Sequence, residues 1–443
     1  MASEFESPGG NILKTALEKQ PVLVLGVEPR ISVPIARSLH RHHIPVMVAA
    51  LSAQEPRISS RAVTNCVRLP SYCESPDHFI DALSSLIHES NVDMLIPATD
   101  AALSAISSHY NHLSELTHVA CPPPLVVDRV LNKQTTLEIA QRCGIRVPGE
   151  YLISEAANLE EIADSLSFPV VAKPRSKGSQ ELFKVRYFHS REKLGDAVQS
   201  GELSGAILQE YCPGAGIGIE ILIHRGKQIA AFQHRRLKEN PHTGGVAVLA
   251  LSEPLNQELV EKAHDLLREI EWDGAAMVEF RWNPADGQAA LMEINGRYWG
   301  TLSLPIQAGI DFPFYQWQLA HDETPQVPSS YVVGMRWRWD AGYIRRVRGI
   351  LPASLKLNAS SLRRDLMSSA MDFLPPVRDA LWSLADPWPA IWEAGRAVKN
   401  VFASDAASVA KRLLPARLRD PFRSYSKPEE HEGSVGIASK KEK

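Results

Sequence analysis

The segment Leu291–Gly300, which reads LMEINGRYWG, decides how this sequence folds and what it binds. It places Glu293, Asn295 and Arg297 two positions apart on a segment that is otherwise apolar. Successive side chains of a β-strand point to opposite faces, so a strand here puts Glu293 and Asn295 on one face and Met292 on the other. The pattern therefore predicts a strand that presents a carboxylate and an amide side by side.

The residues just before this strand predict its partner in a β-hairpin. Ala276–Gln288 reads AMVEFRWNPADGQ, a strand followed by turn residues. If the hairpin closes symmetrically around Asp286, Glu279 lies directly opposite Glu293, and Leu291 shares their face. Directly opposed side chains have Cβ atoms about 5 Å apart, where like charges are destabilising. We therefore expect a cation between the two carboxylates.

Two carboxylates and an amide oxygen are hard ligands that suit Mg²⁺, which keeps water and substrate phosphates as its other ligands. Arg297 would then lie just beyond the metal, where it could hold a phosphoryl group through two hydrogen bonds. The alternative is a solvated polar strand face on which Glu279 forms an exposed ion pair with Arg281. The hairpin alone leaves both interpretations open, because its register is assumed.

Composition sets limits on the class of protein. The chain has 443 residues, enough for two or three domains. The net charge of −3 argues against a general affinity for nucleic acid or acidic membranes. The charge is uneven, because the residues from Tyr331 onward include 20 Lys and Arg against 12 Asp and Glu. We therefore expect the C-terminal segment to differ in character from the rest.

The cysteines and the N-terminus predict a cytoplasmic protein. The five cysteines are scattered and never form a C-x-x-C pair, which favours a reducing compartment over a disulfide framework or a zinc site. The N-terminus, MASEFESPGG, lacks the basic and apolar regions of a signal peptide. No apolar run approaches the length that spans a bilayer.

Residues 21–125 follow a loose lead-in over residues 1–20 and alternate between short apolar runs and helical periodicity. The runs PVLVLGV, IPVMVAAL and NVDMLIPAT are typical of buried parallel strands, so we expect an α/β unit. Gly26 stands alone in GVEPRIS, where a dinucleotide-binding loop needs three glycines, which argues against that function. HRHH (His40–His43) is interpreted as the end of a surface helix rather than as a metal site.

Residues 126–325 mix helices and strands and include two lysines that could hold phosphate. Lys133 opens the predicted helix NKQTTLEIA, and Lys173 ends the buried strand FPVVAKP. An unpaired ammonium is costly in a core, so Lys173 needs an anion. The polar loop RSKGSQ that follows could supply backbone N–H donors to phosphates. The P-loop motif G-x-x-x-x-G-K-[ST] does not occur, which excludes a P-loop protein.

Taken in order, Lys133, VVAKP with Lys173, LQEY, Glu220, VEF and EINGR resemble the motifs of the ATP-grasp superfamily. The sequence is most similar to the branch of the carbamoyl-phosphate synthase large chains and the D-aspartate ligases. The segment FQHRRLKENPHTGG (Phe232–Gly245) is also similar to that branch. The resemblance covers residues 20–325, and it rests on motifs that are weak singly but occur in the right order and spacing.

The resemblance implies an α/β fold with an α+β ATP-grasp part. It implies a Rossmann-like pre-ATP-grasp domain over residues 21–125 and a two-lobed ATP-grasp domain over residues 126–325, with a hinge near residues 209–212. A basic, mainly helical extension would follow over residues 326–428. Residues 429–443 are polar and are expected to be disordered.

The resemblance also implies roles for single residues. Contacts to ATP are expected from Lys133, Lys173, Gly178, Ser179, Gln209, Glu210, Tyr211 and Glu220. Within that set the hinge residues would surround adenine, and Glu220 would lie on the adenine or ribose side. The implied Mg²⁺ ligands, for one or two ions and with Mn²⁺ as an alternative, are Glu279, Glu293 and Asn295. Arg297 and Lys173 would act on the transferred phosphoryl group. The substrate side would be lined by Arg235, Arg236, Thr243, Gly244 and Gly245.

Two positions depart from the superfamily pattern. The loop SKGSQ has fewer glycines than many relatives, and EINGR has glycine where many members have proline. Neither departure removes a charged group, so we do not expect an inactive enzyme.

ATP-grasp ligases activate a carboxylate as an acyl phosphate and join it to an amine or a thiol, releasing ADP and phosphate. The resemblance implies this activity on small-molecule carboxylate and amine substrates, without nucleic acid. One alternative is a bicarbonate-activating enzyme like carbamoyl-phosphate synthase or a carboxylase, although the chain is far shorter than a synthase large chain. A second alternative is a non-catalytic ATP-binding scaffold, which the intact motif residues argue against.

The C-terminal segment leaves several interpretations open. MRWRWD alternates strictly, and Arg336 and Arg338 are interpreted as solvated residues on a sheet edge rather than as a carboxylate clamp. DPWPAIWEAGRAVKNVF (residues 386–402) has apolar residues at helical spacing. This pattern predicts a helix packed on the main body or, alternatively, an interfacial helix that contacts a membrane or a protein partner. A homodimer is also left open.

Overall fold

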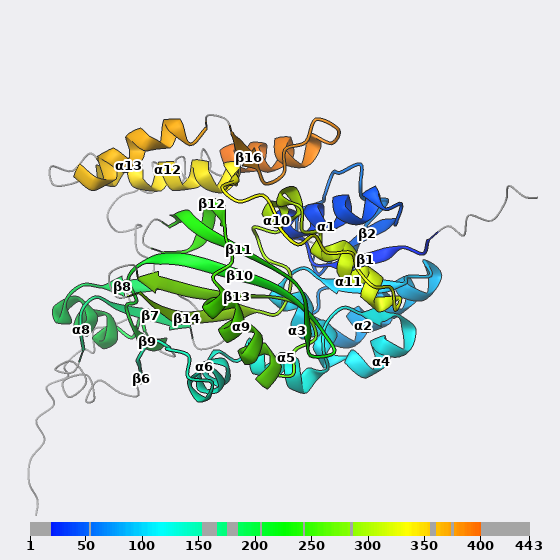
Figure 1. Cartoon of the computed structure of the whole chain (residues 1–443), viewed down its shortest axis with the longest axis horizontal. Helices are drawn as coiled ribbons and strands as arrows, with labels where there is room; N and C mark the ends of the chain where they lie inside the picture. Colours follow the sequence, from blue (N-terminus) through cyan, green and yellow to red (C-terminus); the bar gives the residue numbers. More distant parts are fainter. Residues whose placement is uncertain are drawn as a thin grey trace, which may run out of the picture. The chain divides into compact units, whose positions relative to one another are not determined.

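The computed structural model describes residues 19–52, 55–152, 166–174, 185–203, 206–241, 244–283, 287–354, 360–373 and 376–399. The chain divides into two compact units, Met1–Ala394 and Gly395–Lys443. Figure 1 labels the helices and strands of the first unit. All the sheets and cavities described below belong to the first unit. Within the described ranges, no helix is both long and apolar enough to cross a membrane.

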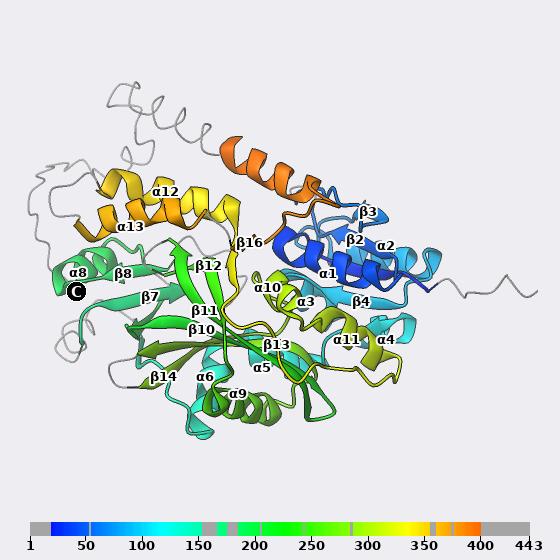
Figure 2. The same cartoon turned by 45° about the horizontal axis from the view of Figure 1, so that its top comes forward.

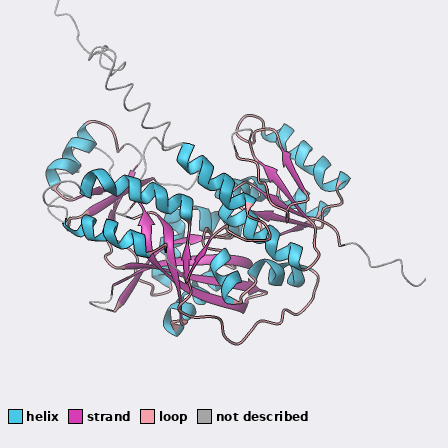
Figure 3. Ribbon diagram, turned by 90° about the horizontal axis from the view of Figure 1, so that it is seen from above, coloured by secondary structure: helices cyan, strands magenta, loops and turns pink. Residues whose placement is uncertain are grey.

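The first sheet is parallel, with strand order β3-β2-β1-β4-β5. Its strands are β1 (Val22–Leu25), β2 (Val46–Ala50), β3 (Asn65–Arg68), β4 (Met94–Pro97) and β5 (His118–Val119). The helices between and after them are α1 (Pro29–Arg41), α2 (Pro76–Glu89), α3 (Asp100–Ser108), α4 (Tyr110–Leu116) and α5 (Pro124–Leu131). Strands β1, β2 and β4 are buried throughout, as apolar strands covered on both faces should be, and Figure 3 shows helices on both sides of them. The predicted parallel α/β arrangement is confirmed.

Two helices of this part, α1 and α3, begin shortly after a strand, and each is capped by a polar side chain. Glu28 caps α1 by accepting a hydrogen bond from the backbone N–H of Arg30 (3.4 Å). Thr99 caps α3 by accepting from the backbone N–H of Ala102 (3.1 Å). The strand order reverses between β1 and β4, so both loops lie at the point where open α/β sheets bind ligands.

The second sheet has seven strands in the order β14-β13-β10-β11-β12-β15-β16. They are β10 (Ala215–His224), β11 (Lys227–Asn240), β12 (Val246–Glu253), β13 (Gly274–Asn283), β14 (Gln288–Asn295), β15 (Arg336–Arg338) and β16 (Val377–Asp379). Helices α9 (Gln257–Glu269), α10 (Ser303–Ala308) and α11 (Phe312–Ala320) complete this part. The turn between β10 and β11 lies at Arg225 and Gly226, both of which have positive φ.

The third sheet is the smallest and has the strand order β6-β9-β7-β8. Its strands are β6 (Glu150–Leu152), β7 (Val170–Pro174), β8 (Arg186–Phe188) and β9 (Ala206–Glu210). Helix α6 (Lys133–Arg142) precedes it in the chain, and α8 (Arg191–Gln199) contacts β8. Asn132 caps α6 by accepting from the backbone N–H groups of Gln134 and Thr135, which fixes Lys133 at the first helical position.

Among the described residues of the first unit, two separate hydrophobic cores are present. One core is shared by the parallel sheet and the seven-stranded sheet, and it joins residues such as Leu23 and Leu95 to Ile219, Phe280 and Leu291. The other core belongs to the four-stranded sheet and α8, and it includes Val170, Phe188 and Leu208. The four-stranded sheet and α8 therefore form a smaller lobe, because they bury their own apolar side chains.

The register of the β13–β14 hairpin agrees with the predicted register at Glu279 and Glu293 and differs from it at the following residues. Glu279 pairs with Glu293 across the hairpin, as symmetric closure predicts. A β-bulge follows, because Phe280 pairs with Leu291 and Met292 is the extra residue. The prediction that Leu291 shares the face of Glu293 is therefore wrong. Leu291 is fully buried in the core, and Met292 lines the cavity beside Glu293.

The C-terminal extension begins inside the second sheet rather than beside it. Strand β15 pairs with β12, and its Trp337 is fully buried. Helix α12 (Asp340–Ser354) lies beside α13 (Ser360–Met371) and contacts β11 and β12 (Figure 2). Arg336 pairs with Asp372 (2.6 Å), and Arg338 pairs with Asp340, so neither arginine is solvated in the way the sequence pattern predicts. The sheet crosses the boundary expected at residue 325, because β15 and β16 belong to the fold of the main body.

Candidate active site

Two cavities meet on one face of the seven-stranded sheet. The first, of about 280 Å³, lies between this sheet and the smaller lobe. The second, of about 260 Å³, lies between this sheet and the N-terminal parallel sheet. Arg236, Val246 and Glu293 line both cavities, so groups bound in the two would meet at these residues.

The lysines predicted from the sequence line the first cavity together. Lys133 comes from the start of α6, and Lys173 comes from β7 of the smaller lobe. Burial and the neighbouring Lys133 ammonium lower the pKa of Lys173, although Glu293 and Glu279 act in the opposite direction. Two ammonium groups that repel each other in a partly desolvated cavity favour an anionic ligand there.

Apolar and aromatic side chains form another wall of the first cavity. Val171, Tyr187 and Met292 line it, and Tyr211 is 38% exposed with its ring edge-on to that of Tyr187, 6.2 Å between centroids. Gly244 approaches this wall so closely that a Cβ atom would lie 2.0 Å from the Tyr187 hydroxyl, at a φ of +135°. A wall of this kind suits a planar, largely apolar group such as a nucleobase.

The predicted hinge residues line the same cavity and are held in place by polar contacts. Gln209 donates a hydrogen bond to Glu150 (2.6 Å). Glu210 accepts from Arg146 (2.8 Å) and from the backbone N–H of Gly149 (3.2 Å). These contacts tie the end of β9 to β6 and to the chain that enters it, just before the chain crosses into the larger lobe.

The opposed carboxylates lie at the junction of the two cavities. Burial raises the pKa of Glu279, the Arg236 guanidinium opposes that effect, and the Glu293 carboxylate adds to it. Glu279 forms an ion pair with Arg236. Asn295 donates a hydrogen bond to Glu293 (3.1 Å). The predicted trio of Glu279, Glu293 and Asn295 is thus brought together on adjacent strands.

The trio fits a divalent cation bound together with phosphate. Within the described ranges, no cluster of three His, Cys, Asp or Glu side chains could hold a metal alone. Glu279 and Glu293 oppose each other at a cost that a cation would remove, and the side-chain amide of Asn295, whose nitrogen donates to Glu293, lies next to them. An ion here would complete its coordination with phosphate oxygens and water, which is how Mg²⁺ is usually held.

A buried network of opposite charges surrounds the carboxylates. Arg281 donates to both oxygens of Glu239 (2.8 and 3.1 Å), and Glu239 lies 3.6 Å from Arg236. Burial would lower the pKa of Arg236, but Glu279, Glu239 and Glu293 outweigh it and raise that pKa. Arg236 is therefore a permanent cation at the junction of the two cavities.

The second cavity combines charges from both sheets. Arg297 lies after β14 and forms two hydrogen bonds to Asp100 at the start of α3, each 3.0 Å long. Arg30 pairs with Glu28 (2.9 Å). Burial raises the pKa of Glu28, but Arg30 and Arg297 outweigh this effect and lower it below its ordinary value. The cavity thus presents cationic and anionic groups together.

Four residues of this cavity were missed by reading the sequence. Glu28, Arg30, Thr99 and Asp100 come from the N-terminal sheet, which was expected to be structural or substrate-side without named residues. The signal was available in the sequence, since these residues follow the two strands that flank the reversal in strand order. Applying the strand-end rule to the segments GVEPR (Gly26–Arg30) and PATD (Pro97–Asp100) would have selected them.

Two predicted residues lie elsewhere. Glu220 is fully buried and forms a 2.6 Å contact with Nδ1 of His234, so its predicted position beside adenine or ribose is wrong. Arg235 points to the other face of β11 and pairs with Glu253 (2.5 Å), so it does not line the substrate side. Strand alternation explains the second error, because Arg235 and its neighbour Arg236 must face opposite ways.

The remaining predicted residues divide between the first cavity and the undescribed segments. Gly244 and Gly245 line the first cavity, and Arg236 donates to the carbonyl of Gly245 (3.0 Å). Gly178, Ser179 and Thr243 lie outside the described residues.

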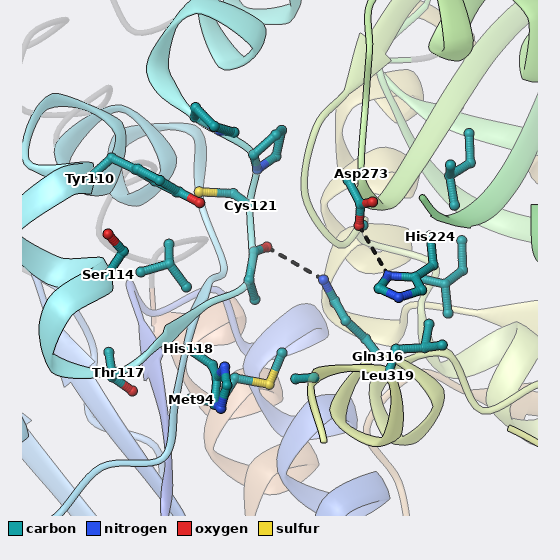
Figure 4. Close-up of a pocket in the computed structure, with 18 of the residues that line it drawn as sticks. Met94, Tyr110, Ser114, Thr117, His118, Cys121, His224, Asp273, Gln316 and Leu319 are labelled. Atoms are coloured by element: carbon teal, nitrogen blue, oxygen red, sulfur yellow. Dashed lines mark hydrogen bonds and ion pairs between the residues drawn. The ribbon is translucent and has the colours of Figure 1, made fainter. Parts of the chain in front are cut away.

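A third cavity of about 390 Å³ shares no residue with the other two (Figure 4). His224 lies 3.5 Å from Asp273 on one of its walls, and Gln316 donates to the carbonyl of Ala120 at 3.5 Å. Burial raises the pKa of Cys121 to about 12, which keeps this thiol protonated and unreactive. The third cavity therefore offers no activated thiol nucleophile, although Glu271 and Asp273 line it.

Comparisons with known proteins agree with this geometry. A family model described as "ATP-grasp in the biosynthetic pathway with Ter operon" matches residues 202–342. A D-aspartate ligase of Enterococcus faecium is 24% identical over 291 residues, covering 59% of this chain and 68% of that protein.

Two solved structures share the fold. The crystal structure of an L-amino acid ligase from Bacillus licheniformis superposes with a TM-score of 0.55 at 20% identity, covering 68% of this chain and 74% of the other. An N5-carboxyaminoimidazole synthetase from Staphylococcus aureus, complexed with ADP, gives 0.55 at 14% identity and covers 72% and 80%.

The two lobes, the opposed carboxylates and the two lysines agree with the ATP-grasp resemblance. The family-model match over residues 202–342, the D-aspartate ligase relative and the shared fold together support an ATP-grasp enzyme. The resemblance drawn from the sequence motifs is confirmed at that level.

Proposed function

We propose that this protein is an ATP- and Mg²⁺-dependent ligase that activates a carboxylate as an acyl phosphate and joins it to an amine, releasing ADP and phosphate. One observation supports this most strongly: the two cavities meet at Arg236 and Glu293, between two lysines on one side and paired charges on the other. A phosphoryl donor in the first cavity can therefore meet a carboxylate in the second. The similarity to a D-aspartate ligase supports the same reaction class.

The first cavity would hold ATP. Tyr187, Val171 and Met292 would surround the base, and Lys133 and Lys173 would neutralise phosphate oxygens. The two ammonium groups destabilise each other when the cavity lacks an anion, so phosphate binding would relieve that repulsion. Gly178 and Ser179, which lie outside the described residues, remain proposed phosphate contacts on the strength of the sequence resemblance alone.

Glu279, Glu293 and Asn295 would hold Mg²⁺. When bound, the ion neutralises charge on the transferred phosphoryl group, and the three side chains orient that group toward the second cavity. Arg236 and Arg297, which line that cavity, would stabilise the negative charge of the acyl phosphate and of the tetrahedral adduct that follows.

The second cavity would hold the carboxylate and the amine. A carboxylate oxygen attacks the γ-phosphorus of ATP, the bond to the β-phosphate oxygen breaks, and ADP leaves. The amine then attacks the carbonyl carbon, loses a proton and displaces inorganic phosphate. Arg297 and Arg30 suit the carboxylate, whereas Glu28 and Asp100 suit an ammonium or amine. The proposal also allows Mn²⁺ in place of Mg²⁺ and a thiol in place of the amine.

A substrate screen tests the proposal. Purified full-length protein is incubated with Mg²⁺ and ATP against a panel of carboxylates crossed with amines, and ADP and phosphate are measured together. The proposal expects ADP release that requires both a carboxylate and an amine, in equal amounts with phosphate. Chelating the Mg²⁺ should abolish it.

The same screen separates the two alternative functions. ADP release with bicarbonate in place of an organic carboxylate would identify a carboxylase-like or carbamoyl-phosphate-forming enzyme. Tight binding of ATP without ADP release for any pairing, including an extended panel of amino acids, would favour a scaffold. Absence of ATP binding would contradict the assignment of the first cavity.

A further inference from the structure

One segment of the C-terminal extension has its polar and apolar side chains in inverted positions. In Trp382–Trp392 the large apolar residues face solvent, with exposed fractions of 52% for Trp382, 89% for Leu384 and 65% for Trp392. Asp386, in the same stretch, is only 5% exposed. A segment that merely covers the body would show the opposite arrangement. We refer to Trp382–Trp392 as the tryptophan segment.

Buried carboxylates hold the tryptophan segment in this orientation. Asp386 accepts hydrogen bonds from Ser60 (2.6 Å) and the backbone N–H of Arg61 (3.1 Å), and it pairs with Arg37 (3.0 Å). Burial would raise the pKa of Asp386, but these partners outweigh it and lower the pKa, so the carboxylate stays ionised. The outward direction of the aromatic side chains is therefore enforced by charge-assisted contacts on the inner side.

The helical part of the segment repeats the inversion. Trp388, Ile391 and Trp392 occupy one helical face and are 49%, 46% and 65% exposed. Glu393 lies on the opposite side, is 6% exposed and pairs with Arg345 (3.0 Å). Two independent carboxylates thus turn the same segment outward.

Such exposure is exceptional in this molecule. Of the nine tryptophans, Trp299 and Trp337 are at most 1% exposed, whereas Trp382, Trp388 and Trp392 are about half exposed or more within 11 residues. Leaving so much apolar surface in water is unfavourable, and concentrated exposure of this kind marks an interaction site. Tryptophan in particular favours a boundary between apolar and aqueous phases.

Two exposed arginines lie beside the segment. Arg61 donates to the carbonyl of Ala385 and is exposed, and so is Arg378 just before the segment. The neighbouring Asp379, in contrast, faces inward and accepts from the backbone N–H of Trp382 (2.6 Å). A surface of aromatic and cationic groups matches the headgroup region of an anionic bilayer. A symmetric dimer would instead bring two basic surfaces together.

We propose that the tryptophan segment docks this protein on anionic lipid bilayers as a peripheral membrane contact. The aromatic side chains enter the headgroup region, and the exposed arginines beside the segment, Arg61 and Arg378, bind lipid phosphates. Each signal alone gives weak binding, and stable association needs both. The proposal concerns a surface away from the two cavities and does not depend on the ligase activity.

Vesicle co-sedimentation of the full chain tests the proposal. The probes are vesicles of phosphatidylcholine with phosphatidylglycerol and vesicles of phosphatidylcholine alone. We expect binding to the anionic vesicles that weakens in about 0.5 M NaCl, because salt at that level screens charges beyond a few ångströms. For the double variant Trp388→Ser/Trp392→Ser we expect vesicle affinity to fall by at least about tenfold, since two exposed apolar anchors are lost.

A matched pair of variants controls for general surface changes. Leu384→Ser removes an 89% exposed leucine from the segment, and Leu125→Ser removes a 78% exposed leucine from α5. Both side chains are exposed, so both variants should fold. We expect weaker vesicle binding for Leu384→Ser and unchanged binding for Leu125→Ser.

Three results would overturn the proposal. One is absence of binding to anionic vesicles at low salt. A second is equal binding by wild type and the double variant, which would assign the contact to charge alone. The third is a wild-type dimer, measured by light scattering, that dissociates in the double variant and leaves lipid binding unchanged, because the segment would then be a protein interface.

Discussion

Glu293 is the residue at which the two cavities and the opposed carboxylates coincide. Glu293→Gln keeps the shape of the side chain and removes its charge, so metal and phosphoryl binding should fail. We expect ADP formation to fall at least about 100-fold, with the fold intact by circular dichroism. Glu253→Gln is the matched control, because Glu253 pairs with Arg235 on the other face, and it should keep near wild-type activity. Equal losses in both variants would contradict the assignment.

Neighbouring arginines on β11 give a second test at this scale. Arg236 lines both cavities, whereas Arg235 points away from them. We expect Arg236→Gln to reduce ADP formation at least about 100-fold, Arg236→Lys to recover part of it, and Arg235→Gln to stay within about threefold of wild type. Initial rates of ADP release measure all three. A larger loss in Arg235→Gln than in Arg236→Gln would reverse the orientation of β11.

Lys173 should separate stability from activity. Burial and Lys133 disfavour its charge in the nucleotide-free protein. Lys173→Met removes the charge and keeps the stem, so we expect a melting temperature higher by on the order of 2 °C and loss of ADP formation. Lys262→Met, on the surface of α9 beside Glu258, should change neither quantity. A lower melting temperature for Lys173→Met would show that the ammonium stabilises the empty cavity.

The residues that could be predicted are those whose positions follow from one strand or one hairpin. Alternation and symmetric closure were enough to oppose Glu279 and Glu293. The position of Glu220 was predicted wrongly because its motif gives no information about His234. His234 lies 14 positions away and is the buried hydrogen-bond partner of Glu220. Asp100 was missed because its contact with Arg297 joins residues 197 positions apart.

At the scale of elements, the seven-stranded sheet depends on close packing between β10 and β11. Gly218 lies under the ring of His234, and a Cβ atom there would come within 2.3 Å of Cε1. We expect Gly218→Ala to lower the free energy of unfolding by about 1–3 kcal/mol, measured by denaturant titration. Gly349→Ala in α12 meets no atom within 4 Å and should stabilise by up to about 1 kcal/mol. Similar stability for both variants would contradict the proposed packing.

Elements were predicted correctly where the sequence pattern is local. The predictions failed at a β-bulge and at a strand that pairs with a distant segment. The parallel strands and both hairpins follow from apolar runs and turn residues. The bulge at Met292 inverts the expected faces of two residues, and alternation alone contains no signal for an extra residue. The sequence pattern of β15 is that of an edge strand. In the structure β15 pairs with β16, which begins 39 positions after β15 ends.

At the scale of the whole first unit, the described residues form two hydrophobic cores, and the first cavity is lined from both sides. The smaller lobe contributes Lys173, and the larger contributes Glu279 and Glu293. The superfamily resemblance predicted this division, whereas composition and length alone predicted only two or three domains. The substrate-facing role of the N-terminal sheet required the three-dimensional arrangement of β1 and β4.

The central claim, an acyl phosphate formed where the cavities meet, can be tested with ¹⁸O. A carboxylate that supports ADP release in the substrate screen is labelled with ¹⁸O in both oxygens, and the released phosphate is examined by mass spectrometry. The account predicts one ¹⁸O atom in each phosphate, because the carboxylate oxygen that attacks ATP leaves with the phosphoryl group. Unlabelled phosphate, formed together with the ligated product, would contradict it.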